Sequence, residues 1–132
     1  MRFPSQPWAD ALRVAVNEDA GYAEVARRWE EDILLRVPPP GAEGLPSPGV
    51  HRDLGNGQCR SARFIENSRT TESEFVFEAS EGNWREVLHR RIDPVPAILG
   101  GTLKVRGKMA KLLRFSRVAR QLVHDVGTFP LG

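Results

Sequence analysis

The chain has 132 residues, of which 40% are hydrophobic and 27% are charged, and its formal net charge is +2. These values are typical of one globular domain and exclude a largely disordered chain. No apolar run is long enough to cross a membrane, and the first residues lack the apolar segment of a secretory signal. The single cysteine, Cys59, fits a reducing compartment. We therefore expect a cytoplasmic protein.

The N-terminal third predicts two amphipathic helices. Apolar residues recur at helical spacing between Trp8 and Val16, and Ser5 is placed to cap that helix. A second stripe runs from Tyr22 to Trp29, after a possible cap at Asp19. Each helix has one apolar face, so each must pack against another element.

The middle of the chain predicts strands. A short branched run, residues 33–37, ends at three prolines, and residues 38–49 form a Pro- and Gly-rich loop that we expect to be flexible. Residues 51–65 read as a hairpin with a tight turn at Asn56-Gly57. Residues 74–79 alternate as a further strand. Short turns between these strands favour an antiparallel meander.

The C-terminal third combines segments with helical spacing and a segment with the alternation of a strand. One helix is predicted from about Asn83, and a second runs from Asp93-Pro94 to Gly100-Gly101. A short strand follows at 103–106, and a last helix covers 108–126. This order predicts an α+β fold with a single, mainly antiparallel five-stranded sheet and helices packed over one face. We expect one domain over residues 1–132.

Motifs for catalysis, metal binding and phosphate binding are missing from the sequence. The three histidines, His51, His89 and His124, have no metal-ligand spacing, and no nucleophile elbow or phosphate loop occurs. We therefore expect no catalytic residue, no metal and no cofactor. An enzyme that uses one of these histidines as a base on a hydrophobic substrate is the least favoured hypothesis.

Large apolar side chains are concentrated in the second half of the chain. They either fill a core or line a cavity between helices and sheet, which periodicity does not distinguish. Leu112, Leu113 and Phe115 widen the stripe of the last helix beyond one face. The candidate ligand-binding residues are Phe75, Phe77, Trp84, Leu88, Ile98, Leu99, Leu103, Val105, Met109, Leu112, Leu113 and Leu122.

Residues 84–126 resemble the sterol carrier protein 2 (SCP2) sterol-binding domain family. The most specific motif is Gly101-x-Leu103-Lys104-Val105-x-Gly107, which is similar to the turn that leads into the last strand of that family. The resemblance implies a curved sheet with an apolar tunnel beneath helices, and a non-enzymatic carrier of fatty acid, acyl-CoA, phospholipid or a sterol-like ligand. The loop at 38–49 departs from the family, and the C-terminus lacks a peroxisomal targeting tail.

A basic face accompanies this resemblance. Lys108, Lys111, Arg114 and Arg117 are candidates for contact with lipid headgroups or with an anionic membrane surface. Nucleic acid is not expected, because the segment lacks interleaved stacking aromatic residues. An SCP2-fold interaction or accessory module for a partner enzyme, without a ligand tunnel, stays open as the alternative. So does the oligomeric state, monomer or dimer.

Overall fold

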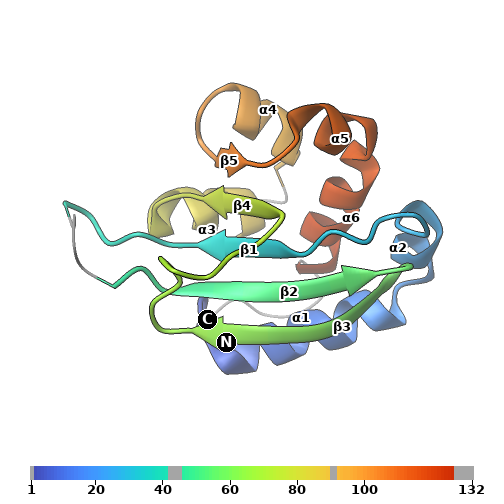
Figure 1. The fold of residues 1–132 in the computed structure, drawn as a ribbon, viewed down its shortest axis with the longest axis horizontal. Coiled ribbons are helices and arrows are strands. Elements are labelled where there is room, and N and C mark those ends of the chain that lie inside the picture. Colours follow the sequence, from blue (N-terminus) through green and yellow to red (C-terminus); the bar gives the residue numbers. More distant parts are fainter. Residues whose placement is uncertain (1, 42–45, 90–91, 127–132) are drawn as a thin grey trace.

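Five strands form one mixed sheet in the computed structural model, which describes residues 2–41, 46–89 and 92–126. The sheet order is β3-β2-β1-β4-β5, and the helices lie on one face of it (Figure 1). The predicted α+β class is confirmed. The strands are β1 (Ile33–Arg36), β2 (Gly49–Gly55), β3 (Gln58–Ile65), β4 (Phe75–Glu78) and β5 (Lys104–Arg106). The helices are α1 (Gln6–Glu18), α2 (Ala20–Val25), α3 (Glu81–His89), α4 (Pro94–Leu99), α5 (Met109–Arg114) and α6 (Ser116–Val126).

The first two helices begin at the predicted caps. The Ser5 hydroxyl accepts a hydrogen bond from the backbone N–H of Trp8 at 3.2 Å, and the Asp19 carboxylate accepts one from Gly21 at 2.8 Å. Both caps satisfy amide groups that have no partner inside the helix. Helix α2 ends at Val25, earlier than the apolar stripe indicates, and a turn carries Trp29 into the core.

The hairpin of β2 and β3 closes as the sequence predicts. Asn56 and Gly57 both have positive φ, 52° and 79°, as a type I′ turn requires. The pairing shifts by one residue between Asp53 and Leu54, which marks a bulge near the turn. Despite that shift, Val50, Arg52 and Leu54 are all buried.

The sheet differs from the predicted meander at β4, which pairs with β1 in parallel. Helix α1 occupies the free edge of β3 with two side-chain amides. Gln6 bonds to the backbone of Ala62 and Phe64 at 3.1 and 2.9 Å, and Asn17 bonds to both backbone groups of Cys59 at 2.9 and 2.8 Å. These amides take hydrogen bonds that a further strand would use at this edge, and β4 lies on the other side of β1 from β2. The predicted antiparallel meander was therefore wrong for β4 alone, and the sheet is mainly antiparallel as predicted.

The predicted last helix is two helices. The break falls at Phe115, whose φ of −106° and ψ of 32° leave helical geometry, and the axis changes direction there (Figure 1). A stripe this wide cannot face one surface along a straight helix. The bend allows Leu112 and Leu122 both to be buried, while Phe115 packs edge-on against Trp29 with ring centroids 5.7 Å apart.

The ends of the Pro- and Gly-rich loop are paired. The backbone N–H of Val37 donates to the carbonyl of Pro48 at 2.8 Å, which extends the ladder between β1 and β2. Residues 42–45, at the centre of the loop, lie outside the described residues. The flexibility expected for residues 38–49 stays a prediction.

Helix α6 is tied to the start of α2 by a carboxyl pair. Asp125 is 1% exposed, and burial together with the hydrogen bond to Asp19 raises its pKa to about 8. The hydrogen bond from Asp125 is the main reason that the pKa of Asp19 falls to about 2. The Gln121 amide also donates to Asp19 at 2.7 Å. At neutral pH the pair therefore holds one shared proton.

Candidate ligand pocket

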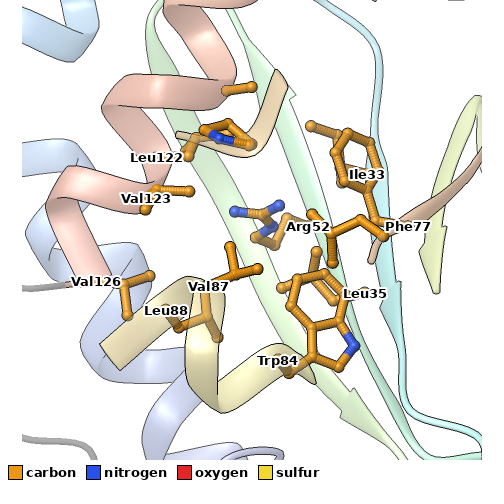
Figure 2. Close-up of a pocket in the computed structure, with 13 residues that line it drawn as sticks. Ile33, Leu35, Arg52, Phe77, Trp84, Val87, Leu88, Leu122, Val123 and Val126 are labelled. Atoms are coloured by element: carbon orange, nitrogen blue, oxygen red, sulfur yellow. The ribbon is translucent and has the colours of Figure 1, made fainter. Parts of the chain in front are cut away.

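An apolar pocket lies between the sheet and helices α3, α4 and α6; we call it the interior pocket (Figure 2). Its floor is formed by side chains of β1, β2 and β4, and its roof by the helices. No acidic residue lines it in the described part of the chain. The lining residues are Ile33, Leu35, Arg52, Phe77, Trp84, Val87, Leu88, Pro94, Leu103, Ala119, Leu122, Val123 and Val126.

The spacing of these residues along each strand and helix points their side chains into the same pocket. Ile33 and Leu35 are two residues apart on β1 and so point to one face of the sheet. Trp84, Val87 and Leu88 recur at helical spacing on α3, as do Ala119, Leu122, Val123 and Val126 on α6. The indole N–H of Trp84 donates to the carbonyl of Arg36 at 2.9 Å, which anchors α3 to the end of β1.

The interior pocket is narrow. Its volume is about 30 Å³, whereas an apolar cavity of about 150 Å³ takes up benzene. A ligand with a long chain therefore fits only if α3 or α6 moves away from the sheet. Within the described residues, no ion pair ties either helix to the pocket floor. Besides apolar contacts, a movement of α3 would break the Trp84 bond to Arg36, and a movement of α6 the Gln121 bond to Asp19.

A surface groove of about 240 Å³ adjoins the interior pocket. The groove lies between the first turn of α4 and the outer side of α6, and it shares Pro94 and Val123 with the pocket. Across it, Arg120 donates to Asp93 at 3.0 Å, and both side chains are almost half exposed. The shared residues place the groove directly beside the interior pocket. The groove is lined by Ile92, Asp93, Pro94, Arg120, Val123 and His124.

The exception to the apolar lining is Arg52, on the sheet floor. Arg52 as a whole is 4% exposed, and Figure 2 shows its guanidinium pointing from the sheet toward the helices. The Nε–H is buried without a hydrogen-bond partner among the described residues. No ion pair or hydrogen bond to another described residue involves this side chain.

Burial lowers the pKa of the Arg52 guanidinium, yet an arginine stays protonated at neutral pH. The groups that act on it electrostatically are Cys59 and Tyr22. Burial raises the pKa of both, so both are neutral near pH 7. Among the described residues, the positive charge of Arg52 thus has no counter-charge.

Sequence reasoning missed Arg52, although a signal was present. Val50, Arg52 and Leu54 alternate along β2, so the arginine occupies a position of the apolar face. A long charged residue at such a position is unusual, because arginine is almost never fully buried without a partner.

The predicted ligand-binding residues divide among four environments. Phe77, Trp84, Leu88, Leu103 and Leu122 line the interior pocket. Phe75 and Leu112 are buried outside it, and Ile98, Val105 and Met109 are partly buried against the core. Leu99 and Leu113 are 72% and 45% exposed, because α4 and α5 turn those positions away from the sheet.

The predicted basic face is not uniform. Lys108, Arg114 and Arg117 are exposed, and the guanidinium of Arg114 lies 5.5 Å from the ring centroid of Phe115. Lys111 instead forms an ion pair with Glu31. Burial of Glu31 opposes its ionisation, but the hydrogen bond and charge of Lys111 outweigh that effect and lower the pKa of the carboxyl. Three of the four bases therefore remain open to solvent.

None of the histidines lines the interior pocket. His51 bonds to Asp32 at 2.6 Å, His89 is exposed, and His124 borders the surface groove. In residues 2–41, 46–89 and 92–126, no three His, Cys, Asp or Glu side chains gather as a metal site would require. No helix among these residues has the length and apolar character needed to cross a membrane.

This chain is similar to known proteins both in its sequence and in its fold. The model of the SCP-2 sterol transfer family matches residues 11–120. A crystal structure of sterol carrier protein 2 is 32% identical, with a TM-score of 0.85, and the match covers 94% of this chain and 96% of that one. No curated protein has a significant sequence match to this chain.

Two further structures extend the comparison. A conserved hypothetical protein from Thermus thermophilus, described as possibly a sterol carrier protein, is 33% identical with a TM-score of 0.86 over 100% of this chain and 92% of its own. Sterol carrier protein 2 from Yarrowia lipolytica is 10% identical with a TM-score of 0.55, over 91% and 89%. That last likeness shows the fold alone.

Proposed function

Because this chain belongs to the SCP-2 sterol transfer family, we propose that it binds and carries a hydrophobic ligand in the interior pocket, without catalysing a reaction on it. The observation that carries the proposal is the apolar lining contributed by both the sheet and the helices. The ligand class is a single-chain lipid, such as a fatty acid or its derivatives, rather than a molecule with several fused rings, since the pocket is narrow.

The energetics favour such a carrier. Each buried methylene contributes about 0.8 kcal/mol, so a chain of about twelve carbons gains roughly 10 kcal/mol before entropy costs are subtracted. Part of that gain offsets the movement of α3 or α6 away from the sheet. The surface groove supports entry between α4 and α6, where Pro94 and Val123 border both spaces.

The test is a pair of matched substitutions. Ala119 lines the interior pocket on α6, whereas Ala110 is exposed on α5. Ala119→Leu fills the pocket and should abolish binding of a fluorescent fatty-acid probe, while Ala110→Leu should leave it unchanged. Circular dichroism checks that both variants fold, because overpacking costs about 1–3 kcal/mol. Equal binding by Ala119→Leu and the unmodified chain would show that the ligand lies elsewhere.

The exposed bases support contact with an anionic membrane surface during ligand exchange. Lys108, Arg114 and Arg117 each contribute up to about 1 kcal/mol near such a surface. Sedimentation with phosphatidylglycerol vesicles, compared with phosphatidylcholine vesicles, measures this contact. We expect binding to the anionic vesicles alone, weakened by salt and by Arg117→Gln.

The accessory module is the second candidate, and the small volume of the interior pocket favours it. A structural neighbour described as a UbiJ-SCP2 ubiquinone synthesis protein has the same fold at 15% identity and a TM-score of 0.54. If native mass spectrometry finds no lipid bound and none is taken up, the accessory module replaces the carrier.

A further inference from the structure

We infer that Arg52 is the specificity-determining residue of the interior pocket and that the ligand is an amphiphile whose small anionic head, a carboxylate, pairs with this guanidinium inside the protein. The inference rests on the proposed function and narrows its ligand class. It predicts a head-inward orientation, with the charged group on the sheet floor and the chain among the side chains of the helices.

The charge of Arg52 is uncompensated within the described chain. A buried cation without a partner is costly, and proteins normally pair it with a carboxylate or replace it by an apolar residue. The neighbouring Cys59 and Tyr22 are neutral at pH 7, and no acidic residue of the described chain lines the pocket. An anion brought by a ligand would supply the missing charge.

The position of the guanidinium also suits a ligand head. Arg52 does not reach the surface: its side chain lies among Ile33, Phe77 and Val87, pointing toward the helices (Figure 2). Its Nε–H has no partner in the described chain, and a guanidinium offers several N–H groups in one plane, which matches the two oxygens of a carboxylate. The narrowness of the pocket favours a carboxylate over a bulky phosphodiester head.

The experiment compares ligands that differ in the head alone. Dodecanoate, dodecanol and dodecyl phosphate compete with a fluorescent fatty-acid probe for the unmodified chain and for Arg52→Met. The unmodified chain should bind dodecanoate about tenfold or more tightly than dodecanol, as expected for a charged hydrogen bond. Arg52→Met should lose that preference while keeping its affinity for dodecanol.

A matched control separates local recognition from overall charge. Arg63 is exposed on β3 and lies opposite His51 of β2 in the register. Because His51 and Arg52 are neighbours on β2, the Arg63 side chain points to the sheet face opposite Arg52. Arg63→Gln removes one positive charge and should leave the preference for dodecanoate intact. A loss of the preference in both variants would overturn the inference, as would its retention in Arg52→Met.

A second measurement uses the unmodified chain and does not depend on any variant folding. Dodecanoate labelled with carbon-13 at its carboxyl group reports its own ionisation by NMR. If the carboxyl binds at Arg52, its pKa should be lower in the bound ligand than in the free one. A higher pKa in the bound ligand would indicate an apolar site and refute the inference. Tighter binding of dodecyl phosphate than dodecanoate would refute the carboxylate assignment.

Failure of the inference and failure of the carrier are distinguishable. Equal binding of dodecanoate and dodecanol leaves the carrier standing and removes the role of Arg52. No binding of any of the three compounds, together with an unchanged melting temperature in their presence, removes the carrier itself.

Discussion

Replacing Gly107 with alanine is expected to destabilise this protein far more than the same change at Gly101, six residues earlier. The two glycines frame the motif that leads into and out of β5, and both have positive φ, 138° and 82°. A non-glycine residue at either position is strained. The two sites differ in the space available for a methyl group.

A Cβ at Gly107 would lie 2.4 Å from the ring of Phe75 and 2.8 Å from the carbonyl of Glu74. The Phe75 ring is held against Trp29, with centroids 5.2 Å apart, and is 2% exposed, so it has little room to turn away. A Cβ at Gly101 would meet no heavy atom within 4 Å. Of the two glycines, only Gly107 therefore has this close contact.

The magnitudes follow from these contacts. Backbone strain at a position that favours glycine costs about 1–3 kcal/mol, and overpacking a filled site costs about 1–3 kcal/mol more. We therefore expect a loss of roughly 2–6 kcal/mol for Gly107→Ala. For Gly101→Ala only the strain applies, about 1–3 kcal/mol.

Urea unfolding followed by circular dichroism measures the two free energies of unfolding, and calorimetry gives the melting temperatures. At about 3–4 °C per kcal/mol for a chain of this size, a loss of roughly 2–6 kcal/mol means that Gly107→Ala should melt about 6–24 °C lower. Equal losses for the two variants would refute the reasoning, because the contact with Phe75 would then contribute nothing.

Three further predictions concern the rest of the molecule. Asp125 keeps its proton up to about pH 8 in the folded chain, whereas an aspartate with the ordinary pKa of 3.8 loses it at lower pH. The free energy of unfolding should therefore fall as the pH rises from 3.8 to about 8. Thermal melts of Asp125→Asn should show a melting temperature that depends less on pH. A matching profile in both proteins would contradict this. Asn17→Ala should lose about 1–3 kcal/mol in urea unfolding, because both backbone groups of Cys59 lose their partner; an unchanged stability would mean that water replaces the amide. Burial and a raised pKa should make the Cys59 thiol unreactive toward iodoacetamide until urea unfolds the chain, and rapid labelling of the native protein would contradict its burial.

Local patterns along the chain were sufficient for most elements. The caps at Ser5 and Asp19, the type I′ turn at Asn56-Gly57 and the alternation of Phe75 and Phe77 are interactions between residues a few positions apart. Such interactions are encoded by spacing and residue type. The motif around β5 likewise identified the family, and Gly107 shows why glycine stands there.

The partners of each element were decided only in three dimensions. β4 pairs with β1, and Gln6 and Asn17 occupy the edge of β3, although each of these partners lies far away in the sequence. Likewise, periodicity named apolar residues without separating those that line the pocket from Leu99 and Leu113, which face solvent. The charge of Arg52, which has no partner among the described residues, likewise became visible only in the structure. Spacing reports which face a side chain takes, but what lies opposite that face depends on how distant segments pack.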